Sequence, residues 1–257
     1  MADELLYARD GGVATVTLNR PDKRNALNSA VLDGLRTTFT RLEDDRDVRV
    51  VVVRGAGTAF CSGMDLNEMR ARQAQAADPE SGVIEVLRRI EGSRHATIAM
   101  VQGDAFAGGC ELALHCDLRV VADHARFAMP LAKLGIIVPF PLGQKLVEIV
   151  GPACTRQILL TGQPVDARRA WEMGMVHEVV PAAELEAKTY ALARAIAANA
   201  PLSLAGMKAT IQRAIALRET IEHKDLDDLV TRARKSGDAR EGVRAMLEKR
   251  PPVFRGE

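Results

Sequence analysis

Four short segments in the first half of the chain have the apolar patterns of β-strands. Residues 13–18 alternate between apolar side chains and threonines, which is typical of a strand with one buried face. Residues 50–53 are four consecutive valines, which predicts a strand buried on both faces. Residues 98–101 and 118–122 are similar apolar runs. Because loops and helical segments separate these runs, the pattern predicts an α/β fold with crossover connections.

Helical spacing of apolar residues marks one early helix and dominates the last third of the chain. The early helix has a single apolar stripe and is capped by Asn28 or Ser29. From residue 185 onward four helical patterns follow one another with no strand signal, and Pro201 occupies a helix-starting position. We therefore expect an α/β core over residues 1–195 and a helical assembly region over residues 196–257.

Composition and charge exclude several classes of protein. The 257 residues carry 35 basic and 34 acidic side chains, and 47% are hydrophobic, which is enough to build a core and excludes wholesale disorder. A net charge of +1 gives no field for capturing nucleic acid, and 4% aromatics give no stacking platform for it. No apolar run reaches the ~18–20 residues of a membrane span. The acidic start and four cysteines without paired spacing predict a cytoplasmic protein with reduced thiols and no metal site.

Two glycine-bearing turns, each after an apolar strand, are the candidates for chemistry. They cover residues 55–66 and 103–112. Neither turn has the glycine pattern of a dinucleotide-binding site or the lysine of a phosphate-binding loop. Ser62 in the first turn does not have the flanking glycines of a hydrolase nucleophile elbow. Glycines at such turns let the backbone approach a ligand closely and leave N–H groups at the start of the next helix unpaired. Two explanations stay open for each turn: close packing alone, or N–H groups that converge on an oxyanion.

Several motifs around these turns occur together in one order along nearly the whole chain. They are Asn19-Arg20-Pro21, Asn25-Ala26-Leu27-Asn28, Ala59-Phe60-Cys61-Ser62-Gly63-Met64-Asp65-Leu66, Ala107-Gly108-Gly109-Cys110-Glu111-Leu112-Ala113, Cys116-Asp117, Leu134-Gly135-Ile136, Leu160-Thr161-Gly162, Ala170 to Val176, Glu241-Gly242 and Glu248-Lys249-Arg250. In this order and spacing the chain resembles the enoyl-CoA hydratase/isomerase (crotonase) family. The resemblance implies a spiral of ββα units and a C-terminal helical region that builds homotrimers, often paired into hexamers.

The resemblance also implies positions for an acyl-CoA substrate. It places the thioester carbonyl against the backbone N–H groups of Met64 and Gly108. It places the CoA nucleotide near Arg24, Ala26, Asp65 and Leu66. It places Lys249 near the CoA phosphate of a neighbouring subunit. Coenzyme A would enter as part of the substrate, with no separate cofactor and with neither nucleic acid nor membrane as a partner.

The acid/base residues depart from the pattern of the family's hydratases, which use two glutamates. Glu111 occupies the first position, where a carboxylate near a helix N-terminus is also structurally favoured. The second position holds Leu131, and a glycine that helps to hold the hydration water is replaced by Pro139, which has no N–H. Residues 134–140 are similar to the mitochondrial Δ3,Δ2-enoyl-CoA isomerases, whose single glutamate lies instead at the position of Leu131. Lys133 is a weak candidate for a substitute base, since a surface role fits it better.

These observations predict an enoyl-CoA hydratase/isomerase-type enzyme, a lyase or isomerase of fatty acid metabolism, that stabilises an enolate and uses Glu111 as its single acid/base. The alternatives are a non-catalytic acyl-CoA-binding protein and another reaction of the family, such as decarboxylation, thioester hydrolysis or isomerisation of a ring substrate. Four histidines have no partner at triad or metal-ligand spacing, so packing or surface roles are expected for them: His95, His115, His124 and His177.

Overall fold

A computed structural model of the protein describes residues 3–74, 81–216 and 222–255. In this described part the strands form a six-stranded sheet in the order β1-β2-β3-β4-β6-β9 and a three-stranded sheet in the order β5-β7-β8. The strands are β1 (Leu5–Asp10), β2 (Val13–Leu18), β3 (Val50–Gly55), β4 (Ala96–Val101), β5 (Ala105–Phe106), β6 (Leu118–Ala122), β7 (Arg126–Ala128), β8 (Val165–Asp166) and β9 (Glu178–Val180). In the large sheet only β1 and β2 pair antiparallel.

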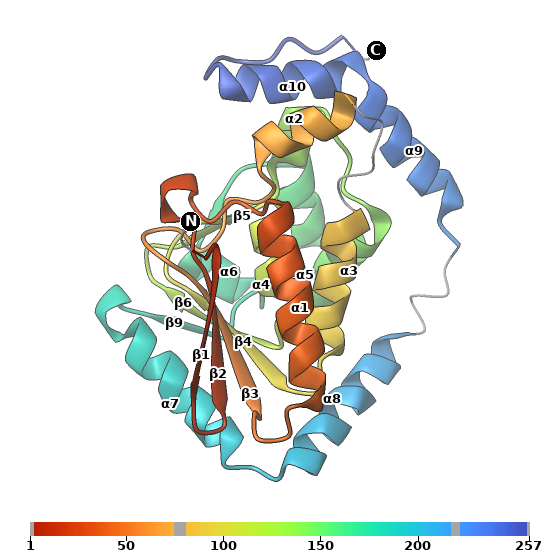
Figure 1. Ribbon diagram of the computed structural model, residues 1–257. Coiled ribbons are helices and arrows are strands. Elements are labelled where there is room, and N and C mark those ends of the chain that lie inside the picture. Colours follow the sequence, from red (N-terminus) through yellow and green to blue (C-terminus); the bar gives the residue numbers. More distant parts are fainter. Residues whose placement is uncertain (1–2, 75–80, 217–221, 256–257) are drawn as a thin grey trace.

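The described helices surround the large sheet on both faces (Figure 1). They are α1 (Ser29–Asp44), α2 (Leu66–Ala74), α3 (Ser81–Gly92), α4 (Gly108–Leu114), α5 (Phe140–Thr161), α6 (Ala167–Glu172), α7 (Leu185–Ala197), α8 (Pro201–Ala216), α9 (Lys224–Lys235) and α10 (Gly237–Leu247). In the same described residues, 3-10 turns lie between a strand and the helix that follows it: η1 (Pro21–Lys23) before α1, η2 (Pro130–Leu134) before α5 and η3 (Ala182–Glu184) before α7. Within the described residues no helix is long and apolar enough to cross a bilayer.

The valine run of β3 shows why the sheet is buried on both faces. Val51 and Val53 join the larger core, which α1, α3, α4 and α5 complete. Val50 and Val52 join a second core on the opposite face, which α7 covers. Because successive side chains of a strand point to opposite faces, a sheet covered twice needs apolar residues at every position. The predicted strand over residues 50–53 is confirmed, as are those over 13–18, 98–101 and 118–122.

The predicted early helix is also confirmed, and Asn28 is its cap. The Asn28 side chain accepts a hydrogen bond from the Val31 N–H at 2.9 Å, which satisfies one of the donors left unpaired at a helix start. The apolar stripe of α1 is fully buried, from Val31 to Leu42.

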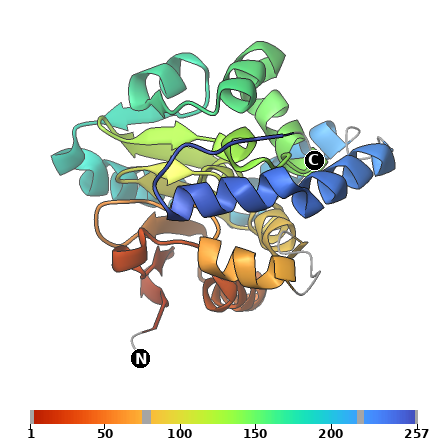
Figure 2. The same cartoon turned by 90° about the horizontal axis from the view of Figure 1, so that it is seen from above.

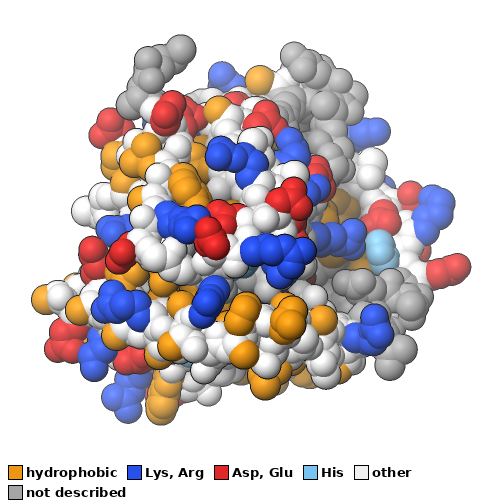
Figure 3. Space-filling model, turned by 60° about the horizontal axis from the view of Figure 1, so that its bottom comes forward, with side chains coloured by type: hydrophobic (Ala, Val, Ile, Leu, Met, Phe, Trp, Pro, Cys, Tyr) orange, Lys and Arg blue, Asp and Glu red, His pale blue; other side chains and the backbone are white. Residues whose placement is uncertain are grey.

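The C-terminal helices differ from the core in how much apolar surface they bury. The four predicted helices are present, but in α8 the expected stripe is largely exposed, with Met207 65% and Ile211 63% accessible. Figure 1 shows α9 and α10 reaching away from the sheet, with α10 lying along α2. Seen from above, α10 crosses the top of the molecule (Figure 2). Figure 3 shows hydrophobic side chains gathered on the face that α8 borders. A single chain therefore leaves part of this region's apolar surface uncovered.

Candidate active site

The two glycine-bearing turns lie side by side in the structure. The first turn is fixed on one flank by Leu27, whose N–H donates to the Gly63 carbonyl at 2.8 Å and whose carbonyl accepts from the Asp65 N–H at 2.9 Å. On its other flank the Phe106 N–H of the second turn donates to the Cys61 carbonyl at 2.9 Å. Because backbone hydrogen bonds fix both flanks, the turns are held together independently of any side chain.

Close backbone contact explains why glycines occupy these positions. Gly63 has φ +93°, and a Cβ there would lie 2.9 Å from the Ala107 Cβ and 3.2 Å from the Gly108 nitrogen. A Cβ on Gly109 would lie 2.2 Å from the Cys61 carbonyl oxygen, a distance that no side chain can adopt. Packing therefore accounts for Gly63 and Gly109, and this contact is what positions the backbone N–H groups of the two turns.

Gly108 is different, because a methyl group there would fit. Its Cβ would lie 3.4 Å from the Leu27 Cδ1 and 3.7 Å from the Met64 nitrogen. The N–H groups of Met64 and Gly108 are thus neighbours. Neither appears as a donor in the backbone hydrogen bonds between described residues outside helices and strands. Gly108 is also the first residue of α4, where an N–H has no partner within the helix. Two neighbouring N–H groups of this kind can both donate to one oxygen.

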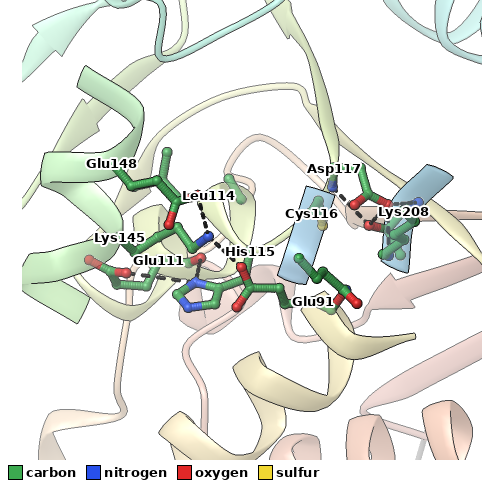
Figure 4. Close-up of polar contacts among 12 residues, drawn as sticks. Glu91, Glu111, Leu114, His115, Cys116, Asp117, Lys145, Glu148 and Lys208 are labelled. Atoms are coloured by element: carbon green, nitrogen blue, oxygen red, sulfur yellow. Dashed lines mark hydrogen bonds and ion pairs between the residues drawn. The ribbon is translucent and has the colours of Figure 1, made fainter. Parts of the chain in front are cut away.

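Glu111 lies one turn further along α4 and is completely buried. Its neighbour is His115, on the same face of the helix at a spacing of four residues. The His115 Nδ1 lies 3.7 Å from Glu111 Oε2 and donates to the Glu111 backbone carbonyl at 2.8 Å. Burial lowers the pKa of His115 to about 4, so its imidazole is neutral at pH 7. Figure 4 shows the two side chains together with Glu91, Lys145 and Glu148.

The wall formed by η2 and the start of α5 carries Leu131 and Pro139, which the family resemblance places at the second acid and at the glycine that holds water. Leu131 is half-buried and packs against the main core and a small cluster made by Leu134, Ile136 and Ala239 of α10. Pro139 is the N-cap of α5 and offers no N–H. Lys133 lies on η2 with its side chain exposed, which fits the expected surface role.

Four of the five residues expected near CoA lie close to the first turn. The Arg24 carbonyl accepts from the Ser62 N–H at 3.0 Å, and the Arg24 side chain is exposed. Arg20 joins Ala26 to Asp65: it donates to the Ala26 carbonyl at 2.6 Å and pairs with the Asp65 carboxylate at 3.0 Å. Leu66 is half-buried at the start of α2. The sequence motifs include Arg20, but they do not predict that its side chain links Ala26 to Asp65.

The fifth residue, Lys249, follows α10 with φ +55° and an exposed side chain. Among the described residues its ammonium has no hydrogen-bond or ion-pair partner. The expectation for Lys249 concerned a neighbouring subunit, which a single chain does not contain.

His115 and its polar neighbours were also missed as a group. Spacing along α4 could have found the pair with Glu111, since residues four apart share a helix face. Glu91 and Lys145 come from other helices, and nothing in the sequence joins them to His115. No group of three or more potential metal ligands occurs in the part of the chain that the structure describes.

Fold and sequence together place the chain in one family of enzymes. The chain belongs to the enoyl-CoA hydratase/isomerase family, whose sequence model matches residues 8–257. It is 35% identical to a probable enoyl-CoA hydratase of Mycobacterium tuberculosis over 98% of both chains. It is 34% identical to the 2,3-dehydroadipyl-CoA hydratase of Escherichia coli K12, covering 98% of this chain and 99% of the relative.

Solved structures show the same fold with other activities. A methylmalonyl-CoA decarboxylase in complex with 2-nitronate-propionyl-CoA superimposes with a TM-score of 0.90 at 26% identity, covering 99% of both chains. An enoyl-CoA hydratase/carnitine racemase of Magnetospirillum magneticum has a TM-score of 0.79 at 36% identity, covering 100% of this chain and 97% of that one. The predicted crotonase-like α/β fold is confirmed, and family membership alone does not select one reaction.

Proposed function

We propose that the protein binds an acyl-CoA thioester with its carbonyl oxygen on the Met64 and Gly108 N–H groups and uses Glu111 as its single general acid and base. The observation that carries this proposal is the meeting of the two N–H groups one helical turn from a buried carboxylate. N–H donors aimed at the oxygen stabilise the enolate that forms when C2 loses a proton. A carboxylate that water does not reach is suited to taking that proton.

The reaction that this arrangement supports best is isomerisation of a 3-enoyl-CoA to a 2-enoyl-CoA. Glu111 takes a proton from C2, and the bonding electrons pass to the thioester oxygen. The carboxylic acid then returns a proton to C4, while a C2–C3 double bond forms and the C3–C4 double bond is lost. One carboxyl group suffices for this sequence. Hydration needs a held water and a second proton path, which Leu131 and Pro139 do not supply.

Decarboxylation is the second candidate, because a methylmalonyl-CoA decarboxylase superimposes on the whole chain. Loss of CO2 from a 2-carboxyacyl-CoA leaves the same enolate, and one acid is enough to protonate it. A non-catalytic acyl-CoA-binding protein would keep the N–H pair and lose the use of Glu111.

The proposal extends to binding of CoA and to assembly. Arg24, Ala26, Asp65 and Leu66 would lie near the CoA nucleotide, and Lys249 of one subunit would reach the CoA phosphate of a neighbour. The exposed apolar surface of α8 supports residues 196–257 as an assembly region behind a core of residues 1–195, in a homotrimer or hexamer. A cytoplasmic role in fatty acid metabolism belongs to the same proposal.

A panel of CoA esters tests the proposed function. The panel contains a 2-enoyl-CoA, a 3-enoyl-CoA, a 3-hydroxyacyl-CoA and a 2-carboxyacyl-CoA, and products are identified by mass spectrometry. We expect turnover of the 3-enoyl-CoA and a fall of about 10²–10⁴-fold in kcat for Glu111→Gln. Glu172→Gln, an exposed carboxylate on α6, is the matched control and keeps full activity. An unchanged rate in Glu111→Gln would refute the role of Glu111, and tight binding without any turnover would favour the non-catalytic protein.

A further inference from the structure

The chain reverses direction after α10 through a backbone motif that usually contains glycine. The Arg250 N–H donates to the Ala245 carbonyl at 3.0 Å, and the Lys249 N–H donates to the Met246 carbonyl at 3.2 Å. These two bonds form a Schellman motif, in which the residue after the C-cap takes a left-handed conformation. That residue is Lys249, with φ +55°. Glycine adopts this conformation freely and a side chain opposes it, so a lysine here destabilises the turn.

The strained turn presents the Lys249 side chain to solvent. The side chain is exposed, and within the described ranges its ammonium has no hydrogen-bond or ion-pair partner. Its two neighbours in the sequence pair with each other, since the Arg250 guanidinium lies 2.6 Å from the Glu248 carboxylate. Strained residues persist where the surrounding structure fixes them, and they are frequent at ligand sites. An unpaired ammonium at a fixed point is suited to binding a phosphate.

Glu241, about two turns earlier on α10, fixes the chain that leaves the turn. Its carboxylate accepts two parallel hydrogen bonds from Arg250, at 2.6 and 3.0 Å, a geometry that sets orientation as well as distance. It also accepts from the Val253 N–H at 3.1 Å and pairs with Arg244. The hydrogen bonds from Arg250 and Arg244 hold the pKa of Glu241 well below its ordinary value, so the group is a carboxylate at pH 7. One side chain therefore ties α10 to the tail on the far side of the turn.

Close backbone contact fixes α10 itself to the core. A Cβ on Gly242 would lie 2.5 Å from the Leu134 carbonyl oxygen, and a Cβ on Gly135 would lie 2.6 Å from the Asp238 carbonyl carbon. No side chain fits at either glycine, so α10 lies directly on the end of η2. The Arg255 N–H donates to the Asp238 carboxylate at 2.7 Å, and the tail runs back beside α10 (Figure 2). The helix, the turn and the tail are thus held as one unit on the core.

We propose that Glu241 is a positioning residue for Lys249: through Arg250 it holds the strained turn in the arrangement that presents the ammonium to a phosphate of CoA. This inference rests on the proposed function, which places a CoA phosphate at Lys249. Glu241 does not touch the phosphate, and its own charge is neutralised by its arginine partners. An ammonium that is already in place spares the ordering of a long side chain on binding. Without the pair the turn relaxes toward conformations that lysine prefers, and the ammonium loses its fixed position.

Binding of butyryl-CoA, a saturated thioester with no double bond to isomerise, tests the proposal by titration calorimetry on the full chain. Lys249→Gly removes the ammonium and the strain together. We therefore expect its Kd to rise about 5–10-fold while its midpoint of urea denaturation also rises, a combination that a structural role does not produce. Glu241→Gln keeps the shape of the side chain and removes its charge, and its Kd should rise by a similar or smaller factor.

The double variant shows whether the two residues act together. It should bind butyryl-CoA no more weakly than Lys249→Gly, because Glu241 acts through Lys249. Glu172→Gln, an exposed carboxylate that pairs with two arginines, is the matched control and keeps the wild-type Kd.

Each other outcome overturns a stated part of the scheme. A wild-type Kd in Lys249→Gly, or a lower denaturation midpoint, overturns the positioning role and leaves the proposed chemistry at Glu111 in place. A raised Kd in Lys249→Gly with a wild-type Kd in Glu241→Gln overturns the positioning role alone, and so does a double variant in which the two factors multiply. A wild type that does not bind butyryl-CoA overturns the proposed function, and this inference with it. If Glu241→Gln does not fold, Arg250→Gln breaks the same pair and replaces it with the same expected result.

Discussion

The two walls of the site differ in what holds them and in what they offer a substrate. The wall of glycine-bearing turns offers backbone N–H groups, and atomic contacts between the turns leave it little freedom. The wall of η2 and α5 offers Leu131, which packs against the core, and Pro139, which has no N–H. Since the N–H groups and the Glu111 carboxyl group lie on one wall, the chemistry that we propose for this site is one-sided.

Backbone strain is confined to the first of these walls. Ala107, the N-cap of α4, has φ +48° and ψ −119°, a conformation that costs a residue with a side chain about 1–3 kcal/mol. Its N–H donates to the Ala128 carbonyl at 2.8 Å, and its carbonyl accepts from the Glu111 N–H at 3.1 Å. These bonds hold the strained residue in place, and they set where Gly108 and Glu111 lie along the helix.

The largest difference in effect should come from adding one methyl group at either of two adjacent glycines, Gly108 and Gly109. One change should lower stability and the other should lower kcat. Gly109→Ala places a Cβ 2.2 Å from the Cys61 carbonyl oxygen, so the turns must separate. We expect at least the 1–3 kcal/mol that overpacking costs to be lost from the free energy of unfolding. Gly108→Ala meets only ordinary contacts, and its methyl lies 3.7 Å from the Met64 nitrogen, beside the proposed oxyanion position. We expect normal stability there and a loss of about 10²–10³-fold in kcat.

Urea denaturation and steady-state kinetics on both variants check this contrast. Gly206→Ala, in α8 with open space around the added Cβ, is the matched control: it should leave kcat unchanged and should not lower the free energy of unfolding, because Ala is favoured over Gly inside a helix. Full activity in Gly108→Ala would show that no substrate oxygen binds between the two turns.

The pattern of the chain predicts the elements well because a doubly covered sheet imposes simple rules. The strand at residues 50–53, the α1 stripe and the Asn28 cap all follow from local sequence. The meeting of Met64 and Gly108 was expected from family resemblance, and spacing alone left packing as an equal explanation. In the structure close packing and the placement of the N–H groups do not compete, because the close contacts at Gly63 and Gly109 are what bring the Met64 and Gly108 N–H groups together.

Two features could not be predicted because they depend on segments far apart in the chain. The pairing of Glu91 with Lys145 joins α3 to α5 across 54 residues, and each residue alone looks like an ordinary surface charge. Exposure of the α8 stripe has a different origin: helical spacing shows that a face is apolar, but not whether the same chain covers it. Met207 and Ile211 fit the helical pattern and remain exposed.

Lowering the pH should reduce the free energy of unfolding through His115, the residue that follows α4. Burial lowers its pKa from 6.5 to about 4. The unfolded chain therefore binds a proton below pH 6.5 that the folded protein refuses until about pH 4. The free energy of unfolding should fall over that interval, with His115 contributing about 3 kcal/mol. Because Gln does not titrate, His115→Gln should lose less stability than the wild type between pH 7.5 and pH 4.

Denaturant titrations across that pH range measure the difference. His177, whose pKa is also lowered to about 4, is present in both proteins, so its contribution cancels in the comparison. His124→Gln removes an exposed imidazole and should follow the wild-type pH dependence. Identical pH profiles for the wild type and His115→Gln would mean that His115 is not held neutral by burial.

The smallest expected effect comes from giving the apolar wall the acid that it lacks. Leu131→Glu puts a carboxylate among Leu134, Ile136 and other apolar groups, and burying an unpaired polar group costs about 1–3 kcal/mol. Leu131 is half-exposed, so we expect the lower end of that range, measured against Leu131→Met as a control of similar volume.

We do not expect Leu131→Glu to hydrate a 2-enoyl-CoA, because Pro139 still offers no N–H to hold the attacking water. The double variant with Pro139→Gly restores that donor, and hydration should be measurable only in this protein, by loss of enoyl absorbance. Hydration by the single variant would mean that the missing acid alone set the reaction. The one-sidedness of the site would then depend on one residue and not on the whole wall.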